Sequence, residues 1–266
     1  KRVAFQPVGF SADGQRAYFL SNFDQEKQDK LGLFEYDFQS KKVDLVHREA
    51  DVDLAGPLLG ANGEVLGVFH LGGRGEQLLM DDRVKHGQFI NMLVQAFKGQ
   101  HVSVTSYSDD GNQAIVRVRS DRNPGEFYLF DLDTRKATFL EASLPKIKAK
   151  QMLETEPVVI AANDGMRLHA LLTRPASKAK QLPLIINVHG GPFGVTDFWG
   201  FHPESQFFAS RGYAVLQVNY RGSGNRGSDF ERAGYRQWGT RMQQDLVDAT
   251  EWAIKEGIAD PKRVCI

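Results

Sequence analysis

Cysteine is almost absent from this chain of 266 residues, and two other common features are missing as well. The single cysteine, Cys265, excludes an internal disulfide and a cysteine-rich metal site. No apolar run approaches the ~20 residues of a membrane span, and residues 1–21 contain no apolar signal-peptide core. We therefore expect no membrane partner, and both the cytoplasm and a bacterial periplasm stay open as compartments.

An excess of charge of one sign is the third missing feature. Lys+Arg and Asp+Glu number 33 each, so the sequence gives no electrostatic argument for nucleic acid or an acidic substrate. The seven histidines are scattered and form no H-x-x-x-H pair. We therefore expect no nucleic-acid partner and no metal site. The sequence leaves the oligomeric state open.

A turn with an Asp-Gly or Asn-Gly pair recurs along residues 1–145. Its glycines, Gly14, Gly63 and Gly111, are spaced by 49 and 48 residues, and alternating apolar runs flank each turn. Such pairs are the strongest short signal for a β-hairpin, because the tight turn needs residues that tolerate a positive φ. A constant period of this length is typical of propeller blades.

Two more apolar runs follow each hairpin and would complete a four-stranded blade. The third runs are Leu31–Phe38, Gln77–Met80 and Glu126–Leu132, and the fourth runs are Lys42–His47, Gln88–Val94 and Lys136–Leu140. Three blades do not close a propeller. We therefore expect residues 1–145 to be an incomplete β-propeller that continues upstream. An open meander or a sandwich is the alternative.

The pattern changes after residues 146–157, which are expected to form a linker. From residue 158 strands alternate with helices, as in a parallel or mixed α/β sheet. The expected strands are Val158–Ala162, Leu168–Thr173, Leu182–His189, Tyr213–Tyr220 and one that starts at Arg263, and the expected helices are Pro203–Arg211 and Thr240–Glu256. Residues 158–266 are thus predicted to be a separate α/β domain.

The sequence His189-Gly190-Gly191-Pro192 directly follows the apolar run LPLIINV. Acyl-transfer enzymes stabilise the negative oxygen of a tetrahedral intermediate with preorganised N–H groups. Glycines let the backbone approach a substrate closely. In α/β-hydrolases one such amide comes from a loop of this kind, often H-G-G-G. We predict Gly191 as the oxyanion donor, supported by His189, Gly190 and Pro192. A plain strand-to-helix turn is the alternative.

The segments VHGGP, SRGYAVLQVNYRGSGNRGSDF, QWGTRMQQDLVDATEWAI and DPKRVCI together resemble the prolyl oligopeptidase family, in its acylaminoacyl-peptidase-like and dipeptidyl-peptidase-like branch. In that family a β-propeller precedes an α/β-hydrolase domain. Its members have a nucleophile elbow, G-x-S-x-G-G, shortly after a strand like RVCI. No G-x-S-x-G occurs in these 266 residues. We therefore expect 158–266 to be a hydrolase domain that stops before the catalytic serine.

The resemblance implies a serine peptidase that hydrolyses short peptides or acyl-peptides through an acyl-enzyme, with no cofactor. None of the triad is present in this chain, so the chain alone is expected to be inactive. The resemblance also places Tyr220 and Arg221 at a possible rim of the pocket. A non-catalytic propeller scaffold is the alternative function.

A dinucleotide fingerprint, G-x-G-x-x-G, is spelled by residues 222–227. Asp245 follows 23 residues after Gly222 but falls in a helical pattern instead of at the end of a strand. A dinucleotide-binding oxidoreductase is therefore the least favoured reading, and the loop is expected to shape the pocket rim. Asp245 and Asp248 precede the expected nucleophile, so the hydrolase order Ser, Asp, His argues against them as triad acids.

Overall fold

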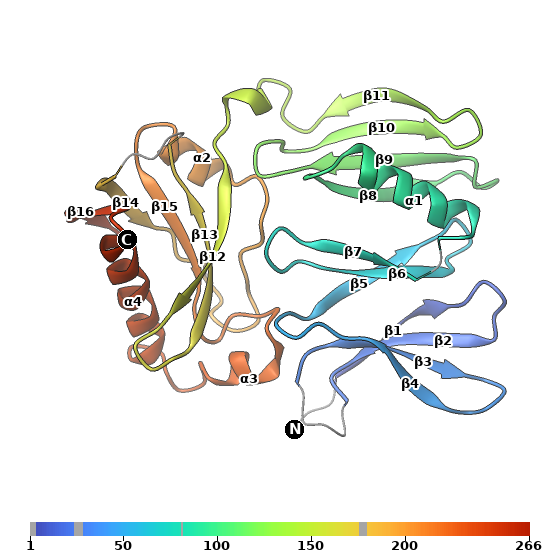
Figure 1. Cartoon of the computed structure of the whole chain (residues 1–266), viewed down its shortest axis with the longest axis horizontal. Helices are drawn as coiled ribbons and strands as arrows, with labels where there is room; N and C mark the ends of the chain where they lie inside the picture. Colours follow the sequence, from blue (N-terminus) through green and yellow to red (C-terminus); the bar gives the residue numbers. More distant parts are fainter. Residues whose placement is uncertain (1–3, 24–28, 81, 176–179) are drawn as a thin grey trace. The chain divides into compact units, whose positions relative to one another are not determined.

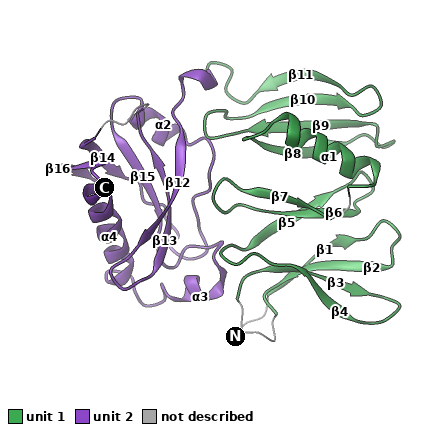
Figure 2. Ribbon diagram, in the orientation of Figure 1, with its two compact units in different colours: residues 1–146 green, residues 147–266 purple. Residues whose placement is uncertain are grey.

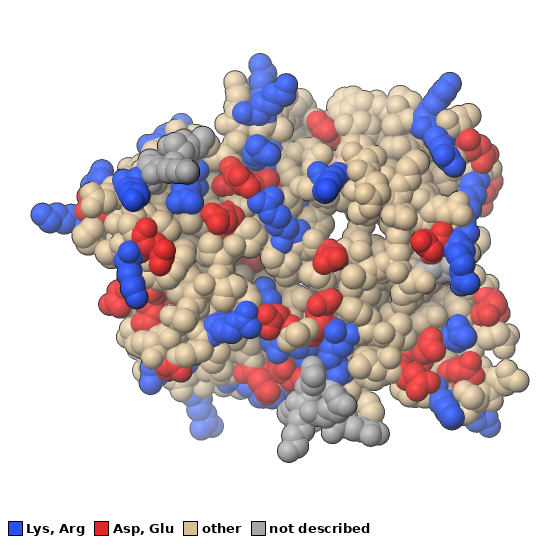
Figure 3. Space-filling model, in the orientation of Figure 1, with Lys and Arg blue, Asp and Glu red and all other residues tan. Residues whose placement is uncertain are grey.

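The computed structural model describes residues 4–23, 29–80, 82–175 and 180–266. The chain divides into two compact units, residues 1–146 and 147–266 (Figure 2). Lys and Arg side chains are interspersed with Asp and Glu over the face drawn in Figure 3, without a large area of one sign. Among the described helices, none is long and apolar enough to cross a membrane.

The described residues of the first unit form three antiparallel sheets (Figure 1). In each sheet the strands pair with their neighbours in the chain, as expected for blades. The first sheet has β1 (Phe5–Phe10), β2 (Arg16–Ser21), β3 (Gly32–Asp37) and β4 (Val43–His47); the second has β5 (Leu54–Leu59), β6 (Val65–His70) and β7 (Glu76–Leu79); the third has β8 (His101–Tyr107), β9 (Gln113–Arg119), β10 (Glu126–Asp131) and β11 (Lys136–Ala142).

The three predicted hairpin turns are present. Gly14, Gly63 and Gly111 have φ angles of +66°, +79° and +69°, which favour glycine over other residues. In two of the turns a serine closes the loop, since Ser11 and Ser108 each donate a hydrogen bond to the aspartate two residues on. The repeat in the sequence therefore has a local physical cause.

The second sheet corrects one prediction. The segment Gln88–Val94, expected as a fourth strand, lies inside helix α1 (Lys85–Ala96). Its buried apolar residues are Phe89, Ile90 and Leu93, and a spacing of one, three and four residues follows the period of a helix instead of the alternation of a strand. Phe89 and Leu93 pack into the core of the third blade.

In the second unit, residues 147–175 and 180–266 form one five-stranded sheet of order β12-β13-β15-β14-β16. The strands are β12 (Thr155–Ala161), β13 (Arg167–Thr173), β14 (Leu182–Ile186), β15 (Ala214–Asn219) and β16 (Ala259–Cys265), and the helices are α2 (Pro203–Ala209), α3 (Gly227–Arg232) and α4 (Arg241–Lys255), with a 3-10 turn at Ala149–Gln151. β14 pairs in parallel with β15 and with β16. Their carboxyl ends therefore meet at one edge of the sheet.

The core of this unit lies between the sheet and α4. All six residues of β15 are buried, which agrees with the continuous apolar run of the sequence. Ala249 and Ala253 of α4 are fully buried, and Leu246 and Trp252 pack around them. Small side chains on the helix allow a close approach to the sheet. Helix α3 and the start of β12 at Thr155, inside the expected linker, were not predicted.

Candidate active site

The loop after β14 contains the predicted oxyanion residues. Asn187 is still tied to the sheet, since its amide donates to the carbonyl of Leu216 at 3.0 Å. Gly191 has a φ of +135°. A Cβ there would lie 2.7 Å from Cγ2 of Val195, whereas a Cβ on Gly190 would meet nothing within 4 Å. The two glycines therefore differ: backbone conformation and space both require glycine at 191, and neither requires it at 190.

His189 is held by hydrogen bonds at both ring nitrogens. Nδ1 lies 2.8 Å from the carbonyl oxygen of Gly190, which can only accept, so Nδ1 is the donor. In the neutral imidazole Nε2 then accepts from the hydroxyl of Ser223 at 3.0 Å. The ring stacks on Tyr220 with centroids 4.7 Å apart, and the Tyr220 hydroxyl donates to the His189 carbonyl at 3.0 Å. These contacts fix the start of the loop.

A cavity of about 300 Å³ lies beside this loop. Its wall combines the loop, the residue after β15, one residue of the segment before α4 and the first turns of α4. These residues are Val188, His189, Gly190, Gly191, Pro192, Tyr220, Trp238, Met242, Gln243 and Leu246. Within the described part of the chain, nothing accepts a hydrogen bond from the amide of Gly191. The amide is therefore available to an acceptor from outside, as an oxyanion donor must be.

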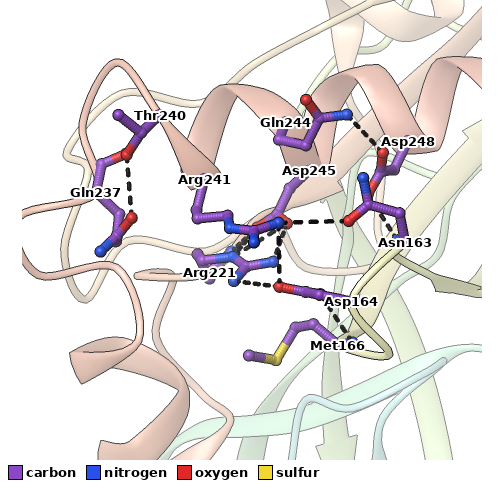
Figure 4. A network of polar contacts seen from close by, with 10 residues as sticks. All are labelled: Asn163, Asp164, Met166, Arg221, Gln237, Thr240, Arg241, Gln244, Asp245 and Asp248. Atoms are coloured by element: carbon purple, nitrogen blue, oxygen red, sulfur yellow. Dashed lines mark hydrogen bonds and ion pairs between the residues drawn. The ribbon is translucent and has the colours of Figure 1, made fainter.

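Of the two residues predicted at the rim, the structure brings one to the cavity. Tyr220 lines it and is 5% exposed. Burial, followed by the charge of Asp197, raises the pKa of its phenol. The phenol therefore stays protonated and remains a hydrogen-bond donor at neutral pH. Arg221 is absent from the cavity wall, because its side chain points into a network of acidic residues (Figure 4).

Two acidic residues hold Arg221 on opposite sides. Asp245, on α4, accepts from Nε at 2.9 Å and from Nη2 at 2.6 Å, and it is fully buried. Asp164, in the turn between β12 and β13, accepts from Nη1 at 2.9 Å. The next turn of α4 binds the same hairpin, since Asp248 accepts from the amide of Asn163 at 2.8 Å. Arg221 thus joins the β12–β13 turn to α4.

The network shifts the pKa values of Asp164 and Arg221. The hydrogen bond from Arg221 lowers the pKa of Asp164 below its ordinary value of 3.8, with smaller contributions from Met166 and Arg241. The hydrogen bonds to Asp245 raise the pKa of the Arg221 guanidinium, against the cost of burial. Arg221 therefore stays charged at any pH at which the fold exists.

A pH-dependent stability follows from Asp164. Because its pKa is lower in the folded state, its contribution is fully present above pH 3.8 and is lost as the pH falls through the folded value. We expect Asp164→Asn to destabilise the second unit by at most about 1 kcal/mol at pH 7, since the side chain is 27% exposed. The check is urea unfolding at pH 7 and pH 3.

The exposed Glu251 of α4 supplies the control for that measurement, as Glu251→Gln. The difference between the Asp164→Asn protein and the wild type should shrink from pH 7 to pH 3, and Glu251→Gln should show no difference at either pH. If the difference in unfolding free energy between Asp164→Asn and the wild type is as large at pH 3 as at pH 7, the lowered pKa of Asp164 is contradicted.

The glycine-rich loop at 222–227 packs on the His189 loop. A Cβ on Gly224 would lie 2.4 Å from the carbonyl oxygen of Gly194, so the two backbones are in direct contact. Gly194 donates to the carbonyl of Gly222 at 3.1 Å, and Gly224 donates to that of Val195 at 3.0 Å. Because this packing fills the space over the glycines, it explains the G-x-G spacing without a nucleotide.

No three His, Cys, Asp or Glu side chains come together as a possible metal site in the described ranges. Sequence reasoning missed two residues that the structure brings to the site, Ser223 and Asp164. A usable signal was present for the first. Ser223 follows β15, and residues at the carboxyl ends of neighbouring parallel strands gather at one edge of the sheet.

Comparisons with known proteins agree with this architecture. Residues 199–266 match the model of the Prolyl oligopeptidase family. The chain is 34% identical over 269 residues to "Dipeptidyl aminopeptidase BIII" of Pseudoxanthomonas mexicana, covering 98% of this chain and 38% of that protein. The chain is also 37% identical over 106 residues to the "Acylamino-acid-releasing enzyme" of Arabidopsis thaliana, and this match covers 40% of the chain and 14% of that protein. The chain thus spans well under half of these relatives.

Solved structures show the same fold. A Mycobacterium tuberculosis puromycin-hydrolysing peptidase superposes with a TM-score of 0.71 at 21% identity, over 98% of this chain and 41% of the other. The Pyrococcus horikoshii acylaminoacyl peptidase superposes with a TM-score of 0.60 at 23% identity, over 99% of this chain and 40% of the other. The predicted fold class, propeller blades followed by the start of an α/β-hydrolase domain, is confirmed. The family resemblance is confirmed as well: this chain belongs to the prolyl oligopeptidase family.

Proposed function

We propose that this chain is part of a serine peptidase that hydrolyses short peptides or acyl-peptides through an acyl-enzyme. One observation carries the proposal. The His189–Pro192 loop presents the amide of Gly191, for which the described residues supply no acceptor, beside a cavity of about 300 Å³ at the carboxyl edge of the sheet. Preorganised amides at such an edge stabilise the oxyanion of acyl transfer.

The position of the nucleophile follows from the sheet. β16 runs parallel to β14, with Cys265 opposite Ile185, so residues that continue from β16 would reach the edge where the Gly191 loop lies. We place the nucleophile elbow there, in the part of the longer enzyme that follows Ile266. The serine would attack the substrate carbonyl, and a histidine, oriented by an aspartate, would take its proton. The Gly191 amide and the amide after the serine would bind the oxyanion.

The substrate classes come from the relatives. Their names specify a dipeptidyl aminopeptidase and an acylamino-acid-releasing enzyme, which points to two substrate types: peptides with a free amino terminus and peptides with an acylated one. The propeller blades would restrict access to short peptides. No observation in the structure favours the scaffold or the oxidoreductase alternative.

Labelling with a fluorophosphonate probe tests the reaction class. Because the nucleophile is placed beyond Ile266, we expect no labelled serine in the 266-residue chain and stoichiometric labelling of one serine in the product of the longer reading frame. Mass spectrometry of the adduct locates the site. Labelling of a serine within the 266 residues, or no labelling of the longer product, would refute the proposal.

The substrate class is tested on the longer product with two chromogenic anilides, a dipeptidyl one with a free amine and an N-acetyl-aminoacyl one. Hydrolysis of at least one of them is expected, and the ratio of the two kcat/KM values assigns the class. If both anilides and a blocked octapeptide stay intact, the protein is not a peptidase of this kind.

A further inference from the structure

We infer that Asp245 is a positioning residue for residues 188–195, called here the oxyanion loop, and acts through Arg221 and the backbone of residues 220–224. This inference rests on the proposed function, because it takes the Gly191 amide as the donor. Asp245 lies on α4 and is not among the residues that line the cavity, and within the described residues no hydrogen bond joins it to residues 188–195. Its carboxylate binds Arg221, and through Arg221 it holds the segment that contacts the loop.

Asp245 binds both the backbone and the side chain of Arg221. One carboxylate oxygen, Oδ2, accepts both the backbone amide of Arg221 at 2.9 Å and its side-chain Nε at 2.9 Å. The other oxygen, Oδ1, accepts Nη2 at 2.6 Å. Because main chain and side chain are bound by one fully buried carboxylate, the backbone at 221 is fixed in place and in orientation.

Residues 220–224 contact the oxyanion loop directly. Every residue of this segment other than Arg221 touches that loop. Tyr220 donates to the carbonyl of His189 and stacks on its ring, and Ser223, which is fully buried, donates to Nε2 of the same histidine. Gly222 and Gly224 form backbone hydrogen bonds with Gly194 and Val195.

These contacts bracket Gly191 on both sides in the sequence. His189 is held two residues before it, and Gly194 and Val195 are held three and four residues after it. Val195 also closes the space beside the Cα of Gly191, since a Cβ there would lie 2.7 Å from Val195 Cγ2. A shift of the 220–224 segment therefore moves both ends of the loop that presents the amide.

The chain offers a matched control on the same helix. Asp248 lies almost one turn after Asp245, is 7% exposed, and also binds across to a loop, accepting from Asn163 at 2.8 Å and from Gln244 at 2.8 Å. In Figure 4 both aspartates extend from α4, and Asp245 meets Arg221 whereas Asp248 meets Asn163. Replacing Asp248 removes a comparable buried contact, and that contact does not involve residues 220–224.

The experiment is amide hydrogen exchange on the 266-residue chain, followed by mass spectrometry, for Asp245→Asn and Asp248→Asn. We expect Asp245→Asn to speed exchange about tenfold or more in peptides covering 188–195 and 220–224, with peptides of β15 and the middle of α4 unchanged. Asp248→Asn should leave 188–195 at the wild-type rate. Equal acceleration in both variants, acceleration across the whole unit, or none at 188–195 would overturn the inference.

Folding of the variant is safeguarded in two ways. Asp164 still binds Arg221 in Asp245→Asn, so the guanidinium keeps one carboxylate. If this protein does not fold, Arg221→Leu/Asp245→Leu replaces the pair with apolar groups, which buried ion pairs often tolerate. The same local acceleration at 188–195 is expected in the double variant, and its absence counts against the inference.

Kinetics of the longer enzyme separate this inference from the proposed function. A positioning role predicts that Asp245→Asn lowers kcat at least tenfold with KM nearly unchanged, and that Asp248→Asn does not. Local loosening of 188–195 with unchanged kcat would support positioning by Asp245 and refute the oxyanion role of Gly191. Reduced kcat with unchanged exchange would refute positioning and leave the proposed function standing.

Discussion

Replacing Gly191 by alanine in the longer enzyme that we propose is expected to lower kcat by about 10²–10³-fold, the usual loss when one oxyanion donor is removed. The substitution keeps the N–H but misplaces it. At φ +135° an alanine is strained, and its Cβ would overlap Val195, so the loop has to move. Because the amide acts on the transition state, KM should change little.

Gly190→Ala is the control, since it makes the same chemical change at the neighbouring position. A Cβ there meets nothing within 4 Å, and the residue has no positive φ. We expect its kcat to stay within a few-fold of the wild type. Steady-state kinetics on the better anilide substrate gives both values. Equal losses for the two variants, or none for Gly191→Ala, would exclude the Gly191 amide as the donor.

The sequence revealed those features of the fold that have local causes. The blades could be located because each hairpin turn needs a glycine at a positive φ, and Gly14, Gly63 and Gly111 repeat at nearly equal distances. The prediction of a strand at Gln88–Val94 was wrong because the constant period suggested a strand where the apolar spacing is helical. A repeat thus predicts that a unit recurs, and it does not predict that every element of the unit is conserved.

The candidate site also combines features that could be predicted from the sequence with features that could not. The His189–Pro192 loop could be found because its function depends on adjacent residues after a buried strand. The pairing of Arg221 with Asp245 could not, because 24 residues separate them and the choice between a salt bridge and a substrate contact depends on packing. The G-x-G spacing at 222–224 suggested a nucleotide, yet Gly224 is small because the backbone of Gly194 lies against it.

The site depends on the core beneath it, and Leu216 belongs to that core. It lies in the middle of β15, is fully buried, and is paired across the sheet with Leu172 on one side and Ile186 on the other. Leu216→Ala should destabilise the second unit by about 3 kcal/mol, because it removes apolar contacts and leaves a cavity that the sheet can close only in part.

Tryptophan fluorescence measures this loss selectively, because Trp199, Trp238 and Trp252 all lie in the second unit. With an m-value of roughly 2 kcal/mol/M, the urea midpoint should fall by about 1.5 M. Val159→Ala is the control on the same sheet; Val159 is 50% exposed, so a change within about 0.5 kcal/mol is expected. A midpoint shift for Leu216→Ala no larger than that of Val159→Ala would contradict the described core. The strands that hold His189 and Tyr220 in register would then need a different source of stability.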